Sequence, residues 1–144
     1  MLVIRPFKRK DFRVVLEIEK RSFLDGDPLL YMELYELYPD GFLVAEVDGR
    51  IVGFIIAILT MDGEGRIFSI AVDEGYRRKG IGTALLNSAF EILKEKGVDS
   101  VRLEVRVTNH PAQSLYRKLG FVDVGFIPNY YRNGEDAIVM RKKL

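Results

Sequence analysis

The chain has 144 residues, is 48% hydrophobic and carries a formal net charge of +1, which favours a single domain over residues 1–144 and excludes a disordered chain. The balanced charge argues against a nucleic-acid partner, and no apolar run approaches the roughly 20 residues of a transmembrane helix, so no membrane partner is expected. Cysteine is absent, which excludes disulfides and thiolate chemistry; since the N-terminus also lacks the apolar core of a signal peptide, we expect a cytoplasmic location.

The first half of the chain predicts a short strand, two helices and an antiparallel meander. "LVIRP" is expected to be a strand, and apolar residues at helical spacing predict an amphipathic helix over residues 8–23. A second helix over residues 29–38 is stopped by "PDG". Two apolar runs flank Asp48-Gly49, a sequence typical of a hairpin turn, and a third strand, "RIFSIAV", follows Asp62-Gly63.

The second half alternates strands and helices. A helix is predicted from about residue 80 to 96, where Gly97 follows as a stop signal. "SVRLEVRV" is an alternating strand, "HPAQSLYRKLG" a short helix, and "FVDVGF" and "DAIVMRKK" a closing pair of strands. The order predicts a mixed α/β (α+β) domain.

The stretch "RRKGIG", residues 77–82, places two glycines at the start of the long helix. Glycine lacks a Cβ, so a ligand can approach the backbone closely, and the first N–H groups of a helix have no partner within it. Such a turn is an anion site, to which the three preceding cations would add charge-assisted contacts. The spacing matches neither the nucleotide-triphosphate loop nor the dinucleotide fingerprint. The alternative is an ordinary turn with solvated cations.

The surrounding residues identify the ligand by resemblance. "SIAVDEGYRRKGIGTALL" resembles the acetyl-coenzyme A signature of the GCN5-related N-acetyltransferase (GNAT) superfamily, and "LEVRVTNHPAQSLYRKLGF" is similar to its second half. The resemblance implies acetyl-CoA as co-substrate and a single domain with a mixed, mostly antiparallel sheet of about six or seven strands. It also implies about four helices on both faces of the sheet and a splayed strand pair that admits the pantetheine arm.

The same resemblance assigns the cofactor site. The strand "SIAV" would pair with pantetheine, the amides of the glycine turn would hold the pyrophosphate, and the N–H of Val72 would face the oxyanion. The cofactor-binding residues that we expect are Ile70, Ala71, Val72, Arg77, Arg78, Lys79, Gly80, Ile81, Gly82, Thr83 and Asn109. One histidine and no cysteine argue against a metal site, so no metal is expected.

Two residues are candidates for the proton transfers of acetyl transfer. Glu104 lies on the polar face of "VRLEVRV" between two arginines, which would favour its ionised form, as a base requires. Tyr116 follows on the next helix and could protonate the thiolate, since a phenol has a pKa near 10. The structural alternatives are a salt-bridged surface glutamate and a tyrosine packed between helix and sheet.

The acceptor is inferred from three further segments. "RSF", "NYY" and "EDAIVM" resemble the RimI and Ard1 type of N-terminal α-amino acetyltransferases, which makes Phe23, Tyr130 and Tyr131 candidates for binding a protein or peptide N-terminus. Tyrosine combines apolar contact with a hydroxyl for peptide backbone, although such aromatics also serve as packing. Acetylation of lysine or of a small amine such as a polyamine or antibiotic, and a CoA-binding module without activity, remain alternatives. Either a monomer or a homodimer is compatible with the sequence.

Overall fold

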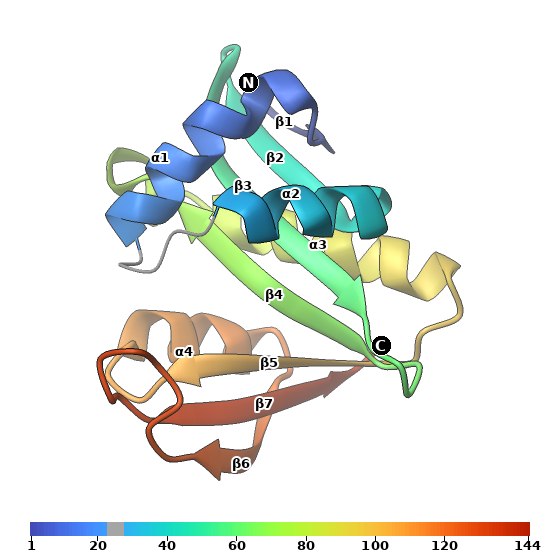
Figure 1. The fold of residues 1–144 in the computed structure, drawn as a ribbon, viewed down its shortest axis with the longest axis vertical. Coiled ribbons are helices and arrows are strands. Elements are labelled where there is room, and N and C mark those ends of the chain that lie inside the picture. Colours follow the sequence, from blue (N-terminus) through green and yellow to red (C-terminus); the bar gives the residue numbers. More distant parts are fainter. Residues whose placement is uncertain (23–27) are drawn as a thin grey trace.

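The computed structural model describes residues 1–22 and 28–144 and contains one seven-stranded sheet (Figure 1). The strand order is β1-β2-β3-β4-β5-β7-β6, and every neighbouring pair is antiparallel except β4 and β5. The strands are β1 Leu2–Pro6, β2 Phe42–Val47, β3 Arg50–Leu59, β4 Gly65–Val72, β5 Ser100–Arg106, β6 Val122–Ile127 and β7 Ala137–Lys143.

In these described residues four α-helices cover the sheet, two on each face (Figure 1). Helices α1 and α2 pack on one face, and α3 and α4 on the other. Their bounds are α1 Phe12–Ser22, α2 Pro28–Leu37, α3 Ile81–Glu95 and α4 His110–Lys118. The 3₁₀ turns are η1 Arg9–Asp11, η2 Pro39–Gly41 and η3 Glu74–Tyr76. The predicted fold class, with its helices on both faces, is therefore confirmed.

Each face of the sheet has its own hydrophobic core. Under α1 and α2 the core is aromatic: Phe7 stacks on Phe42 with ring centroids 4.1 Å apart, and Tyr31 meets Phe54 edge-on at 6.0 Å. Under α3 and α4 it is mostly aliphatic, with Leu85 and other fully buried side chains. Both helical layers are held on the sheet mainly because their packing removes this apolar surface from water.

The predicted hairpin turn between β2 and β3 has the expected geometry. Asp48 and Gly49 have φ values of 51° and 83°, the left-handed conformation that a two-residue hairpin turn of this sequence adopts. The predicted helix over residues 8–23 is shorter in the structure, because residues 9–11 form η1 and α1 begins at Phe12. In the described residues, no helix is long and apolar enough to cross a membrane.

Strands β4 and β5 diverge almost as soon as they pair. Only Gly65 and Arg66 of β4 pair with β5, opposite Val101 and Arg102. Immediately afterwards β4 contains a bulge, because Ile56 and Ala57 of β3 face Ser69 and Ile67, which leaves Phe68 as the extra residue. Beyond the bulge, the edge of β4 that faces β5 pairs with no strand of the described chain. This divergence confirms the splayed strand pair expected from the resemblance.

Candidate active site

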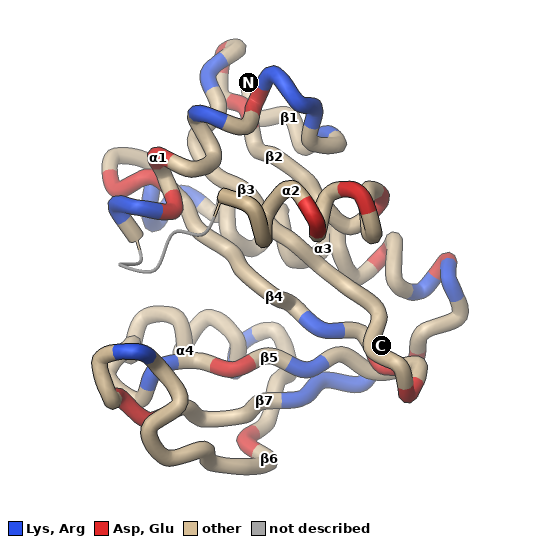
Figure 2. Tube along the Cα trace, in the orientation of Figure 1, with Lys and Arg blue, Asp and Glu red and all other residues tan. Residues whose placement is uncertain are grey.

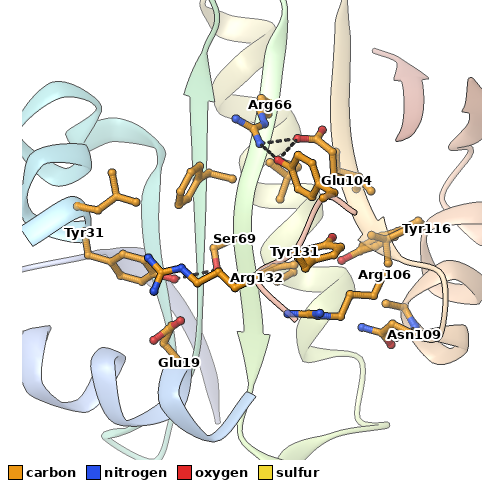
Figure 3. A pocket seen from close by; sticks show the side chains of 18 residues that line it. Glu19, Tyr31, Arg66, Ser69, Glu104, Arg106, Asn109, Tyr116, Tyr131 and Arg132 are labelled. Carbon is orange, nitrogen blue, oxygen red and sulfur yellow. Dashed lines mark hydrogen bonds and ion pairs between the residues drawn. The ribbon is translucent and has the colours of Figure 1, made fainter. Parts of the chain in front are cut away.

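A cavity of about 390 Å³ lies in the gap between the splayed strands (Figure 3). Its walls come from α1, α2, β4, β5, α4 and the connection between β6 and β7. The polar and aromatic lining residues are Glu19, Tyr31, Arg66, Phe68, Ser69, Glu104, Arg106, Asn109, Tyr116, Tyr130, Tyr131 and Arg132. Both proposed proton-transfer residues and both described tyrosines of the acceptor prediction thus line one cavity.

Glu104 lies on the cavity side of β5, as the alternation of that strand predicts. Its side chain is only 8% exposed and is paired with two arginines, Arg66 on β4 and Arg102 on its own strand at 3.7 Å. The hydroxyl of Tyr130 donates a hydrogen bond of 3.1 Å to the same carboxylate. Glu104 is therefore an ion-paired carboxylate, as the structural alternative supposed, but it lies in the cavity wall rather than on an open surface.

Tyr116 is 7% exposed and belongs to the core under α4, where its ring centroid lies 5.8 Å from that of Phe121. In Figure 3 its hydroxyl points from α4 towards Tyr131 and the cavity. Burial raises the pKa of Tyr116 above that of a free phenol, and the nearby Tyr131 acts in the same direction. The side chain is thus packed and, at the same time, presents a protonated hydroxyl to the cavity.

Helix α4 is fastened to the end of β5 by polar contacts. The buried amide of Gln113 donates to the backbone carbonyls of Arg106 and Val107 at 2.9 and 3.0 Å. The Asn109 side chain caps the helix by accepting from the N–H of Ala112 at 3.3 Å, and Asn109 also lines the cavity. These contacts fix the helix that carries Tyr116 relative to the strand that carries Glu104.

The connection between β6 and β7 brings two tyrosines over the cavity. Tyr130 and Tyr131 pack edge-on with ring centroids 5.0 Å apart, and the guanidinium of Arg106 lies 4.0 Å from the ring of Tyr131. Burial raises the pKa of Tyr131 to about 12 and also raises that of Tyr130. Both hydroxyls therefore remain hydrogen-bond donors at neutral pH. Phe23, the third residue of the acceptor prediction, lies outside the described residues.

The glycine turn begins α3 as expected. Gly80 is the N-cap with φ 79°, no side chain caps this end of the helix, and a Cβ at Gly80 would meet no atom within 4 Å. Arg78 has φ 63°, an uncommon conformation for a residue with a side chain. A Cβ at Gly82 would lie 3.4 Å from Leu115 of α4, so the turn borders the helix that carries Tyr116. The backbone at this end is open to an anion, which fits a pyrophosphate.

The three cations beside the turn differ in their surroundings. Arg77 donates to the carbonyl of Val72 at 3.0 Å, so it holds the turn against the end of β4. The ammonium of Lys79 lies 5.4 Å from the ring centroid of Tyr76. Arg78 and Lys79 are exposed, so their charges are accessible to a ligand at the turn.

We expect the double variant Arg78→Gln/Lys79→Gln to raise the KM for acetyl-CoA by roughly three- to tenfold, because charge-assisted contacts are lost while the backbone amides remain. The kcat should stay within about twofold of the wild type, because the lost contacts bind acetyl-CoA equally in the ground state and in the transition state. Steady-state kinetics with varied acetyl-CoA would measure both constants. A fall in kcat with an unchanged KM would contradict this assignment.

Several cavity residues were not predicted from the sequence. Tyr31 of α2 donates to Ser69 of β4 at 3.1 Å, and burial raises the pKa of this tyrosine. Glu19 of α1 is 3% exposed, although an amphipathic helix would be expected to turn its glutamates outward. Arg66 reaches both Glu104 and Tyr130. Their positions depend on contacts between distant segments, and no local motif marks them.

The splayed strand pair, the glycine turn at a helix N-terminus and the cavity that holds a carboxylate and a phenol agree with the acetyltransferase architecture expected from the resemblance. The Acetyltransferase (GNAT) family model matches residues 12–121, and the chain belongs to this family. Membership makes it an N-acetyltransferase, for which acetyl-CoA is the acyl donor.

Individual relatives agree with this assignment. The chain is 39% identical over 154 aligned residues to an N-alpha-acetyltransferase of Sulfurisphaera tokodaii, with 98% of this chain and 92% of the relative covered. The structure of Ard1 from Thermoplasma volcanium matches with a TM-score of 0.95 and 37% identity, covering 99% and 97% of the two chains. The ribosomal-protein-S18-alanine N-acetyltransferase from Escherichia coli matches with a TM-score of 0.85 and 31% identity, covering 99% and 94%. The resemblance to the RimI and Ard1 branch is thus confirmed.

Proposed function

We propose that the protein transfers an acetyl group from acetyl-CoA to the N-terminal α-amine of a protein or peptide. The observation that carries the proposal is the shared cavity, in which Glu104, Tyr116, Tyr130 and Tyr131 meet at the gap between β4 and β5. The names of the relatives from Sulfurisphaera tokodaii and Escherichia coli point to the same acceptor class.

Glu104 is the proposed base. An α-ammonium has a pKa near 8, so the amine must lose a proton before it can attack a carbonyl. The carboxylate Oε1 already accepts from Arg66 and Tyr130, while Oε2 is buried with no hydrogen-bond partner among the described residues. A carboxylate has about four acceptor positions and the described hydrogen bonds fill two, both on Oε1, so capacity remains; because Oε2 is closed to solvent, an amine or a bridging water would have to approach from the cavity beside Tyr130.

Tyr116 is the proposed acid. Burial keeps its phenol protonated, so the group can give a proton to the departing sulfur. Because Tyr116 is held by the core and by the fastening of α4 to β5, the hydroxyl stays directed at the cavity. Acetyl-CoA supplies the thioester that makes the acyl group transferable.

The residues proposed to hold acetyl-CoA lie on β4, whose Ile70 lines the cavity, and at the start of α3, which lies outside the cavity lining. The edge of β4 beyond Phe68, which pairs with no strand of the described chain, offers backbone groups to the pantetheine arm: the N–H and C=O of Ile70 and the N–H of Val72, whose carbonyl already accepts from Arg77. The amides at the start of α3, around Gly80 and Gly82, would receive the pyrophosphate. The backbone N–H of Val72 is the proposed oxyanion donor.

The acceptor site is proposed to be the part of the cavity under the β6–β7 connection. Tyr130 and Tyr131 offer aromatic surface and protonated hydroxyls, which suit an extended peptide better than a small polyamine. The same lining holds three arginines, Arg66, Arg106 and Arg132, beside two carboxylates, Glu19 and Glu104, so it lacks the excess of negative charge that would favour a polycation.

The test uses a library of short peptides with free N-termini, matched N-acetylated peptides that carry a free lysine, and a set of polyamines. Mass spectrometry would locate the acetyl group after incubation with acetyl-CoA. We expect the free N-termini to react at least tenfold faster than the blocked lysine peptides. Equal rates for the two peptide sets would contradict the proposed preference for the α-amine. Turnover of polyamines alone would favour a small-amine acetyltransferase.

A further inference from the structure

Arg66 occupies the vertex of the gap between β4 and β5. It is the last residue of β4 that pairs with β5, and its Cα partner is Arg102. The bulge at Phe68 follows two residues later, and the side chain of Arg66 lines the cavity where the two strands begin to diverge. Its guanidinium carbon lies 5.6 Å from the centroid of the Phe68 ring, which supports the side chain.

From this position one guanidinium nitrogen joins three segments of the cavity wall (Figure 3). Nη2 of Arg66 donates both to Oε1 of Glu104 on β5 and to the Tyr130 hydroxyl, the latter at 2.9 Å. Tyr130 in turn donates to the same Oε1 at 3.1 Å. The three groups form a closed triangle of hydrogen bonds in which the proposed base and the acceptor-binding connection share one donor.

The arginines around this triangle account for the ion pairing of Glu104. Figure 2 shows basic positions on β4, β5 and β7 beside one another, where Arg66 faces Arg102 across the strands. Like charges in directly opposed positions destabilise a sheet, and the carboxylate of Glu104 between them offsets this repulsion. Glu104 accepts a hydrogen bond from Arg66 at Oε1, whereas Arg102 lies 3.7 Å from Oε2, beyond hydrogen-bond distance, so Arg66 holds the carboxylate in place and Arg102 contributes only its charge.

We propose that Arg66 is a positioning residue for acetyl transfer: it fixes the carboxylate of Glu104 at the vertex of the gap and couples it to Tyr130. Because Tyr130 belongs to the β6–β7 connection, Arg66 and Tyr130 together hold the Glu104 carboxylate in place only while this connection lies over the cavity. This inference rests on the proposed role of Glu104 as base. Arg66 acts through another side chain, so it should affect the rate of the chemical step more than the binding of acetyl-CoA.

The experiment compares Arg66→Gln, Arg66→Lys and Arg102→Gln in the full chain, with a free-N-terminus peptide as acceptor. Arg66→Gln should lower kcat by roughly 10–100-fold while the KM for acetyl-CoA stays within about twofold, because the base is misplaced rather than removed. Arg66→Lys should recover part of this loss, since its ammonium keeps the charge and can donate to both partners but lacks the planar, preorganised geometry of the guanidinium. Arg102→Gln is the matched control, because Arg102 pairs with the same carboxylate but does not line the cavity, and it should change kcat by less than about threefold.

A double-mutant cycle separates positioning from a general structural role. In a Glu104→Gln background, Arg66→Gln should cause little further loss, because residues that act as a unit are not additive. The inference would be overturned if the losses of kcat caused by Arg66→Gln and Glu104→Gln were fully additive, or if Arg66→Gln retained the wild-type kcat. If the wild type acetylates N-termini and Glu104→Gln is impaired while Arg66→Gln is not, only this inference fails. If the wild type acetylates no N-terminus, the proposed function itself fails.

Discussion

Glu104→Gln is expected to lower kcat by about 100–1000-fold with little change in the KM for either substrate. General base catalysis contributes an effect of this size, and glutamine has the shape of glutamate but cannot take up the proton. Its amide oxygen can still accept from Arg66, so the cavity wall should keep its arrangement. Steady-state kinetics with a free-N-terminus peptide would measure the loss.

Glu64→Gln is the matched control for this variant. Glu64 is 11% exposed and also pairs with arginines, Arg141 at 2.7 Å and Arg102 at 3.8 Å, but it does not line the cavity. Removal of this charge should leave kcat within about threefold of the wild type. A Glu104→Gln enzyme that retains most of its kcat would show that another group, or solvent alone, takes up the proton of the amine.

Tyr116→Phe is expected to lower kcat by about 100-fold, because the departing sulfur loses its proton donor. The ring remains in the core beside Phe121, so the melting temperature should change little. Burial raises the pKa of Tyr116, which keeps the wild-type phenol protonated at neutral and mildly alkaline pH. The alkaline limb of the pH–rate profile should therefore have the same midpoint in the wild type and in the variant.

Tyr35→Phe serves as the control for loss of a tyrosine hydroxyl. Tyr35 lies on α2 with its ring centroid 5.0 Å from that of Phe7, and it does not line the cavity. This substitution should leave kcat unchanged within about twofold. If Tyr116→Phe behaves in the same way, Tyr116 is a packing residue, and the proton reaches the sulfur by another route.

Local signals in the sequence predicted the elements and part of the site. The turn at Asp48-Gly49 and the alternation along "VRLEVRV" depend on neighbouring residues only, and both were confirmed. Glycine at a helix N-terminus is also a local signal, and Gly80 is the N-cap of α3. Glu104 was placed on the polar face of its strand by the same alternation, which Val101, Leu103 and Val105 complete as buried residues.

The bulge in β4 shows where periodicity stops being sufficient. Ile67 packs in the core under α3 and α4, whereas Ala71, four residues later, packs in the core under α1 and α2. Strict alternation would place these two residues on the same face, but one extra residue at Phe68 exchanges the faces. The bulge is set by pairing with β3 and by packing on both sides, so it has no signature within "RIFSIAV" itself.

The sequence by itself thus determined the family and the glycine turn, because these depend on residue type at short spacing, and the family resemblance named the proposed acid and base. Only the tertiary structure placed Arg66, Glu104 and Tyr130 in one triangle, since 38 residues separate the first two and 26 the last two. Their meeting requires that β4 and β5 diverge and that the β6–β7 connection folds back over the gap. Hydrogen bonds between such distant segments follow from the packing of the whole sheet, which no single stretch of sequence encodes.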